Sequence, residues 1–293
     1  MPSHKPPGRR PSDKSRKPPS APRSNVPLHA AKRRGYGDAE DEIVAIFGIH
    51  SAEAALRNPA RVIRRALLTE NAENRLKEAL IRPGLTLERA TPKDLDHLLG
   101  ADTVHQGALI ECEPLPEPDL ADLVVGSPGL PASRPGPALL LILDQVTDPH
   151  NVGAVLRSAA VFGASGLIIT RRNSPPLSGA LAKAASGALE LVPIARIQNL
   201  ALALEELEDM GVARIGLDGA AETDLEDAAG LAGPLALVLG AEGRGLRQLT
   251  RESCDQLCRI GTPGPLASLN VSNAAAVGLH IAASARRRAS TER

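Results

Sequence analysis

The chain has 293 residues, and its 34 Lys and Arg residues balance 34 Asp and Glu residues, so the formal net charge is zero. Aromatic residues are limited to Tyr36, Phe47 and Phe162, which largely excludes RNA binding by stacking of bases on aromatic platforms. The sequence shows neither a long apolar run nor an apolar signal-peptide core, which predicts a cytoplasmic protein without a membrane span.

Residues 1–41 are rich in Pro, Ser, Lys and Arg, and their few apolar residues show no periodicity. Such a segment cannot bury enough apolar surface to offset the entropy of ordering, so we expect a disordered basic tail. Two interpretations remain open. The tail is either a solvated segment that aids solubility, or an arm that binds phosphates in a salt-sensitive way.

Residues 42–114 predict a small α/β domain with short elements. Expected strands cover residues 43–47, 62–69, 86–90 and 108–112. Three helices are expected: one capped by Ser51, one over residues 73–80, and one that starts at Thr91-Pro92. His50, His105 and Gln106 are polar residues at the ends of these elements. From the residues alone, each histidine is more readily explained as a hydrogen-bonded structural residue than as a ligand.

Residues 115–137 are rich in Pro and Gly, with acidic residues in the first half. This composition predicts a linker that is semi-stiff where prolines cluster. A hinge of this kind would let the two domains move relative to each other.

Residues 138–293 alternate between apolar strands and helical segments. We expect Asn151 to cap the first helix and Gly163 to end it. The pattern predicts a mostly parallel sheet covered by helices on both faces. The expected strands cover residues 139–143, 167–170, 189–194, 212–217 and 235–239.

The final helix is apolar on almost all sides, and its residues are mostly small. A helix of this kind is buried on several sides. Either a large core or a second subunit could cover it, and we favour a homodimer. The residues concerned are Val271, Ala274, Ala275, Val277, Gly278, Leu279, Ile281 and Ala282.

Three cysteines, Cys112, Cys254 and Cys258, have no pairing motif. Cys254 and Cys258 could share one face of a helix, but the sequence offers no convincing further ligands for zinc. We therefore predict reduced structural thiols and no metal site.

The strand expected at 235–239 runs into Gly240, and Gly243, Gly245 and the carboxylate of Glu242 follow. Glycines allow positive φ and a close approach of the backbone to a ligand. Their order is not that of a dinucleotide-binding fingerprint. Ligands bind at the carboxyl ends of parallel strands, so this loop, Asn151 and Asn270 could gather around a small molecule.

Three segments resemble the sequential motifs of the SpoU/TrmH branch of the SPOUT methyltransferases. These segments start at Asn151, Gly240 and Ser268, and they read NVGAVLR, GAEGRG and SLNVS. The resemblance implies a SPOUT α/β-knot fold with a C-terminal trefoil knot, preceded by a small L30e-like RNA-binding domain. It also implies S-adenosylmethionine as the methyl donor, a homodimer formed through the knot domain, and 2'-O-methylation of a ribose. Within the branch, the enzymes that methylate guanosine in 23S rRNA are the most similar.

By position in the motifs, the resemblance assigns roles to individual residues. Contacts to the donor are implied for Gly240, Glu242, Gly245, Ile260 and Leu269. Catalytic or substrate-contacting roles are implied for Asn151, Arg157, Glu242, Ser268 and Asn270, and RNA contacts for His50, His105 and Gln106. The sequence departs from the family at Ile260-Gly261, where relatives usually have Ile-Pro, so the backbone contacts of this loop are in question.

These residue types suit methyl transfer from a sulfonium to a ribose hydroxyl, an in-line displacement that needs an aligned hydroxyl, removal of its proton and no metal. Arg157 could bind the target phosphate, but a guanidinium stays protonated and is a poor base. We expect Arg157 to be essential without being the proton acceptor. Glu242 is expected either to position Arg157 or to complement the positive charge of the donor.

Three other functions compete with this one. A ribosome-assembly factor that binds RNA without turnover is disfavoured by the intact motifs, and a nucleotide-dependent oxidoreductase by the order of the glycines. A tRNA 2'-O-methyltransferase remains open. The sequence also leaves open whether the partner is free 23S rRNA or an assembly intermediate.

Overall fold

The computed structural model describes residues 43–127, 136–262, 264 and 269–291. The predicted basic tail and Ser268 lie outside the described residues. Within the described part, no helix combines the length and apolar character that a membrane span requires.

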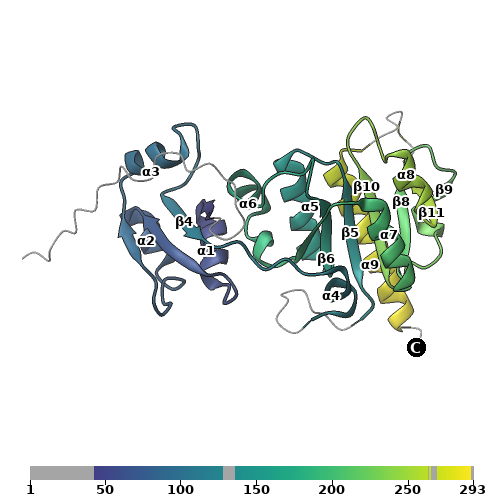
Figure 1. Ribbon diagram of the computed structural model, residues 1–293, viewed down its shortest axis with the longest axis horizontal. Coiled ribbons are helices and arrows are strands. Elements are labelled where there is room, and N and C mark those ends of the chain that lie inside the picture. The colour runs from purple at the N-terminus through teal and green to yellow at the C-terminus, as the bar shows by residue number, and fades with distance from the viewer. Residues whose placement is uncertain (1–42, 128–135, 263, 265–268, 292–293) are drawn as a thin grey trace, which may run out of the picture. The chain divides into compact units, whose positions relative to one another are not determined.

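The N-terminal part of the described chain, coloured purple to blue in Figure 1, contains a four-stranded sheet. Its strand order is β1-β4-β2-β3. Its strands are β1 (Val44–Phe47), β2 (Ile63–Leu68), β3 (Leu87–Arg89) and β4 (Ala108–Cys112). β4 pairs antiparallel with β1 and β2, whereas β2 and β3 are parallel. The helices are α1 (Ile49–Arg57), α2 (Glu70–Leu76) and α3 (Pro92–Leu99). Short alternating elements were predicted here, and this is confirmed.

Two predicted helix starts in this region were wrong. α1 begins at Ile49 after Gly48, so Ser51 lies inside the helix, and its buried hydroxyl donates to the carbonyl of Ala182. α2 begins at Glu70 because Thr69 accepts a hydrogen bond from the amide of Ala72 and caps the helix. At α3 the prediction was right, since Thr91 and Asp94 form a reciprocal capping box.

The segment predicted as a linker contains a helix, α4 (Leu120–Val125). Leu120 and Leu123 are buried against residues of the larger sheet. The Pro-rich composition around this helix gave no sign of it, because two apolar anchors in six residues are too few for a periodic pattern.

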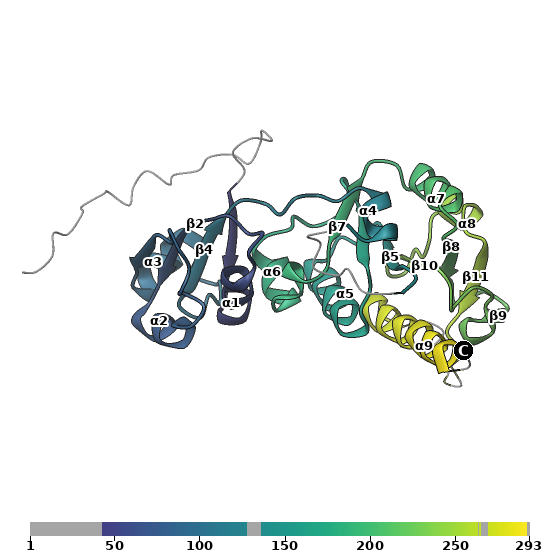
Figure 2. The same cartoon turned by 90° about the horizontal axis from the view of Figure 1, so that it is seen from below.

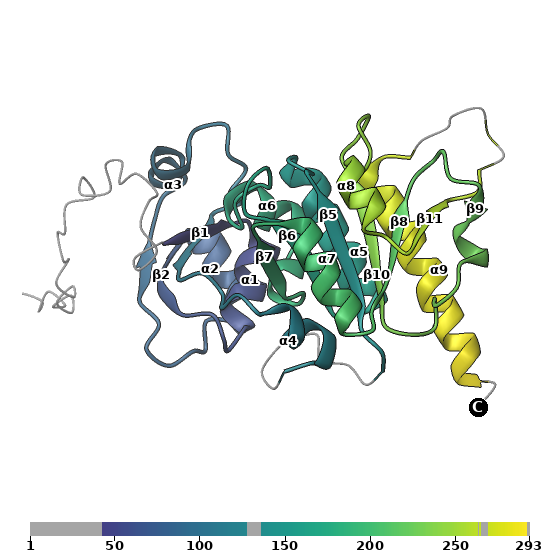
Figure 3. The same cartoon turned by 45° about the vertical axis from the view of Figure 1, so that its right-hand side comes forward.

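The larger sheet has seven strands in the order β7-β6-β5-β10-β8-β11-β9, and every neighbouring pair is parallel. Figure 3 shows β9 and β11 toward the edge farthest from β7. The strands are β5 (Leu139–Asp144), β6 (Gly166–Thr170), β7 (Ile194–Ile197), β8 (Ala213–Leu217), β9 (Thr223–Asp224), β10 (Leu235–Gly240) and β11 (Gln256–Arg259).

Helices cover both faces of this sheet, as the continuous apolar strands predicted. Alternate residues of β5 enter two separate clusters: Leu139, Leu141 and Leu143 pack with α5 and α9, and Leu140 and Ile142 pack with α4 and α7. Figure 2 shows α5 and α9 on one side of the strands and α4 and α7 on the other. The helices are α5 (Pro149–Phe162), α6 (Gly179–Ala185), α7 (Leu200–Asp209), α8 (Gln248–Glu252) and α9 (Val271–Thr291).

Three predictions in this region are corrected. Asp148, not Asn151, caps α5, because its side chain accepts from the amide of His150, whereas Gly163 ends the helix as predicted. The strand expected at 189–194 is a short 3₁₀ turn, Ala188–Glu190, and β7 starts only at Ile194, after Pro193. Cys254 and Cys258 do not share a helix, since Cys258 lies in β11.

Candidate active site

β5 and β10 lie side by side at the point where the strand order of the large sheet reverses. On one side of this pair, β6 and β7 follow β5 outward in the sheet. On the other side, β8, β11 and β9 lie next to β10 in that spatial order. Asp144 and Gly240, the last residues of the two strands, are paired in register. The carboxyl ends of strands at such a switch point are the usual place for a ligand in a parallel α/β sheet.

The loop after β10 folds back on itself and has room only for glycine at its start. A Cβ on Gly240 would lie 2.1 Å from the carbonyl carbon of Gly245. The amide of Gly245 donates to the carbonyl of Ala241 at 2.8 Å and closes the loop. Gly243 and Gly245 have φ of +75° and +65°, which side chains rarely adopt. The glycines predicted from the sequence are therefore required by the shape of the loop.

Glu242 in this loop brings together two of the other predicted catalytic residues. Its Oε1 accepts a hydrogen bond from Asn151 Nδ2 at 3.1 Å and another from Asn270 Nδ2. Asn270 Nδ2 also lies 3.0 Å from Asn151 Oδ1, to which it donates. Three segments of the chain thus meet in one cluster of two amides and a carboxylate.

The same cluster lies at the N-terminus of α9. Asn270 caps this helix, because its Oδ1 accepts from the amide of Ser272 at 2.9 Å. The amide of Val271 donates to Glu242 Oε1 at 3.4 Å. A carboxylate at this end of a helix is stabilised by the helix dipole, so Glu242 is held by charge as well as by its amide partners.

A cavity of about 870 Å³ opens beside this cluster. Its size is in the range of small-molecule sites, which run from roughly 300 to 1,000 Å³. The five residues expected to contact the donor all line it: Gly240, Glu242, Gly245, Ile260 and Leu269. Backbone of the glycine loop and aliphatic side chains such as Leu217 and Leu239 make up much of the wall, which suits an adenosine-sized ligand.

Asp218 and Arg251 also line this cavity and form an ion pair across it. Neither residue was predicted from the sequence to be part of the site. Asp218 directly follows the strand predicted at 212–217, so its position at the carboxyl edge of the sheet could have been predicted from the sequence. Arg251 lies in α8, a five-residue helix that the sequence analysis missed.

Of the predicted catalytic residues in the described part of the chain, Arg157 is not brought into the cluster. It is exposed on α5, and its side chain makes no hydrogen bond or ion pair with any residue in the described part of the chain. It follows Asn151 by six positions, which places the two side chains roughly 120° apart around the helix. No contact in the structure supports the expectation that Glu242 positions Arg157.

The residues expected to contact RNA have different surroundings. His105 is buried, its Nδ1 accepts from the amide of Gly107 at 3.0 Å, and its Nε2 lies 3.1 Å from Asp96 Oδ1. Gln106 Oε1 accepts from the amide of Ile49 at 3.0 Å, which satisfies the start of α1. Both side chains are therefore used inside the sheet domain, whereas His50 is exposed on α1.

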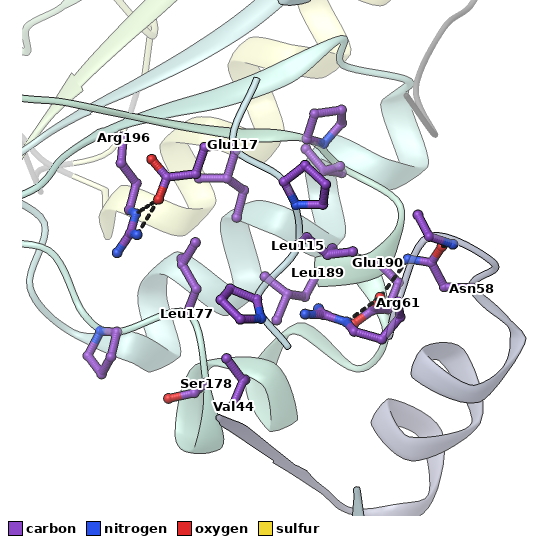
Figure 4. A pocket seen from close by; sticks show the side chains of 17 residues that line it. Val44, Asn58, Arg61, Leu115, Glu117, Leu177, Ser178, Leu189, Glu190 and Arg196 are labelled. Carbon is purple, nitrogen blue, oxygen red and sulfur yellow. Dashed lines mark hydrogen bonds and ion pairs between the residues drawn. The ribbon is translucent and has the colours of Figure 1, made fainter. Parts of the chain in front are cut away.

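A second cavity, of about 140 Å³, lies away from the glycine loop (Figure 4). Apolar residues, prolines and leucines prominent among them, form most of its wall. Its charged residues are paired with each other, Arg61 with Glu190 and Arg196 with Glu117. The charged side chains that line this cavity therefore already have partners.

The described residues contain no group of three or more His, Cys, Asp or Glu side chains that could hold a metal ion. The cysteines are free thiols. Burial raises the pKa of Cys112 and of Cys254 to about 11, so both thiols are protonated and poor nucleophiles near neutral pH.

Comparison with known proteins identifies two family matches in this chain. Residues 138–280 match the SpoU rRNA methylase family, and residues 45–118 match a family described as RNA 2'-O ribose methyltransferase substrate binding. The chain is 41% identical over 241 residues to 23S rRNA (guanosine-2'-O-)-methyltransferase RlmB of Photobacterium profundum, covering 80% of this chain and 94% of the relative. It is also 41% identical to the enzyme of the same name from Vibrio cholerae, with the same coverage.

Solved structures show the same fold. The SpoU methyltransferase AviRb from Streptomyces viridochromogenes, in complex with AdoMet, superposes with a TM-score of 0.70 at 22% identity, over 84% of this chain and 91% of that one. A structure described as an RNA 2'-O ribose methyltransferase gives a TM-score of 0.63 at 26% identity, over 84% and 89% of the two chains. The sequence relatives, which this chain matches over nearly their whole length, show that it belongs to the SpoU rRNA methylase family.

Proposed function

We propose that this protein transfers a methyl group from S-adenosylmethionine to the ribose 2'-hydroxyl of a guanosine in 23S rRNA. The observation that supports it best is the cluster of Asn151, Glu242 and Asn270 at the edge of a cavity lined by the glycine loop. The reaction of the RlmB relatives, as their name gives it, is the second support.

Bound S-adenosylmethionine would supply an electrophilic methyl group on a sulfonium. The chain's own residues would hold the donor in the cavity, and the carboxylate of Glu242 would complement its positive charge. The amides of Asn151 and Asn270 have further hydrogen-bonding capacity for the ribose. Arg157, without a partner in the described part of the chain, is free to bind an RNA phosphate and align the hydroxyl.

We further propose that residues 42–114 form an L30e-like domain that binds the RNA, and that residues 138–293 form the methyltransferase domain, whose C-terminal part is a trefoil knot. One cavity is lined by the segments after β8 and β10 and by Ile260, Thr262 and Leu269. This lining supports the knot, because a threaded chain would bring these segments together around one cavity. His50 is the best-exposed of the proposed RNA contacts. The basic tail would add salt-sensitive phosphate contacts.

The protein would act in the cytoplasm as a homodimer formed through α5 and α9. These helices pack on each other, and Phe162 and His280 make an edge-to-face contact with ring centroids 5.8 Å apart. Val161 beside them is 75% exposed. An exposed branched apolar side chain next to a helix pair of small residues is suited to a second copy of the chain.

A charge at Val161 tests this arrangement. We expect Val161→Glu to convert the dimer to a monomer in light scattering, because an unpaired carboxylate would be buried at the interface. Leu202→Glu is the control, since Leu202 is 59% exposed on α7, away from the α5–α9 face. A wild-type protein that is monomeric at micromolar concentration would contradict the proposal.

The function itself is tested by mapping 2'-O-methyl groups in total RNA from cells with and without the gene. We expect one guanosine in 23S rRNA to lose its methyl group, and the purified protein to restore it with S-adenosylmethionine. Loss of a tRNA methyl group instead would favour the tRNA enzyme. Donor binding by calorimetry without transfer to any RNA would favour the non-catalytic assembly factor.

A further inference from the structure

Asp144 is the last residue of β5, and its side chain is fully buried. This side chain accepts three hydrogen bonds from a segment about a hundred residues later in the chain. Its Oδ2 accepts from the amide of Arg247 at 3.1 Å and from Thr250 Oγ1 at 2.8 Å. Its Oδ1 accepts from Arg247 Nε at 2.8 Å. A buried carboxylate is costly unless such partners satisfy it, so the three bonds hold the later segment in place.

That segment is the far end of the glycine loop. Gly240 starts the loop and is paired in register with Asp144 itself, and Arg247 lies two residues past Gly245. Asp144 therefore contacts the loop region at both ends, through the sheet at the start and through its side chain at the finish. Between these anchors the loop contains Gly243 and Gly245. A glycine loses more backbone conformational entropy on ordering than any other residue type.

We propose that Asp144 is a positioning residue for the methyl donor, which rests on the proposed function. Asp144, Arg247 and Thr250 do not line the donor cavity, whereas Glu242 and Gly245 of the loop do. By fixing Arg247 and Thr250, the Asp144 carboxylate keeps the glycine loop in the shape in which Glu242 reaches Asn151. The protein thus has its cavity formed before the donor arrives, and donor binding need not order the loop.

The test variant is Asp144→Asn. Asparagine keeps the volume and one oxygen, but its NH₂ group faces a donor of Arg247 or Thr250 and the charge is lost. We expect the dissociation constant for S-adenosylmethionine to rise about tenfold or more, as for a lost hydrogen bond to a charged group. The KM for the donor should rise more than the KM for RNA. In the donor-free protein, amide hydrogen exchange in residues 241–250 should become faster.

Thr250 provides a second and milder test that does not depend on folding of the Asp144 variant. Thr250→Val removes the hydroxyl at nearly constant shape and should weaken donor binding, whereas Thr250→Ser keeps the hydroxyl and should restore it. Equal donor affinity in the Val and Ser variants would overturn the proposal.

Asp255→Asn is the matched control. Asp255 accepts from the amide of Arg214 at 2.7 Å and from its Nε at 3.2 Å, the same pattern at the amino ends of β8 and β11, away from the cavity. It should lower the melting temperature without changing donor affinity. If Asp144→Asn behaves in the same way, with normal donor affinity and normal loop exchange, Asp144 is only structural. A wild-type protein that binds no donor would instead refute the proposed function.

Discussion

Arg157 lies on the exposed side of α5 without a partner in the described part of the chain, so replacing it should not disturb the fold. Arg157→Lys keeps the charge but loses the planar fork that grips a phosphate through two hydrogen bonds. We expect single-turnover methylation of rRNA to fall about a hundredfold, as for a misplaced reacting group. Donor affinity and melting temperature should stay near the wild-type values.

The control for this prediction is Arg287→Lys, at an exposed arginine of α9 whose side chain donates to Ser284 Oγ. It should methylate at the wild-type rate. Near-normal turnover by Arg157→Lys would mean that Arg157 acts only by long-range attraction, and a large drop in melting temperature would mean that it supports the fold.

At this scale the sequence was most informative where a residue's position along the chain also fixes its place in the sheet. Asn151, Glu242 and Asn270 follow strands or open a helix, and they meet as expected at one edge. One of the two roles expected of Glu242 was to position Arg157, but six helical positions turn the Arg157 side chain away from Asn151. His105 contacts Asp96 in α3, and Gln106 accepts from the amide of Ile49 in α1. These partners lie in other elements, so a local pattern could not have shown them.

At the scale of the elements, α5 was predicted with the right C-terminal end, and Val152, Val155, Leu156 and Ala159 share its buried face. α4, α8 and β11 were missed, and each has only four to six residues. Such short elements have little stability of their own and depend on packing against neighbours that are distant in the sequence. Gly153, by contrast, has a role in α5 that only the packing of helices explains.

Gly153 lets α5 approach α6 closely. A Cβ at this position would lie 2.5 Å from Ala184 Cβ and 2.8 Å from the backbone nitrogen of Ala185. Because backbone cannot yield as a side chain does, we expect Gly153→Ala to lower the free energy of unfolding by about 1–3 kcal/mol, despite alanine's better helix propensity. The measurement is urea unfolding followed by circular dichroism.

Gly278→Ala is the matched control in α9. Its Cβ would meet Leu237 Cδ1 at 3.3 Å and Leu217 Cδ1 at 3.4 Å, both at the ends of flexible side chains. These can shift slightly, so helix propensity should offset the strain and leave stability nearly unchanged. If Gly153→Ala is as stable as Gly278→Ala, the close approach of α5 to α6 has no energetic weight.

For the whole molecule, the class of fold followed from the sequence but the order of the strands did not. Continuous apolar strands alternating with helices predict a parallel sheet covered on both faces. They do not say that β10 returns to pair with β5, or that β11 inserts between β8 and β9. That return creates the switch point at which Gly240 meets Asp144, and with it the cavity. The prolines of the linker also predicted a hinge between the two domains.

A buried ion pair bears directly on that hinge. Arg61, between α1 and β2, donates through Nη2 to Glu190 Oε1 at 2.7 Å and through Nε to Oε2 at 3.2 Å (Figure 4). Both side chains are at most 3% exposed. Asn58 Nδ2 also donates to Glu190 at 2.7 Å. These contacts join the segment between α1 and β2 to the 3₁₀ turn before β7. A freely moving hinge would break them.

We therefore expect Glu190→Ala to lower the free energy of unfolding by about 3–5 kcal/mol, because it leaves the Arg61 guanidinium buried and without a counter-charge. The double variant Arg61→Leu, Glu190→Leu should lose less, since it leaves no buried charge. Arg89→Ala is the control. The Arg89 side chain is 75% exposed, so loss of its ion pair with Glu73 should leave stability nearly unchanged. Melting temperature and urea midpoint are the measurements. A Glu190→Ala variant as stable as Arg89→Ala would show that the ion pair does not fasten the two segments, and the predicted hinge would then stand.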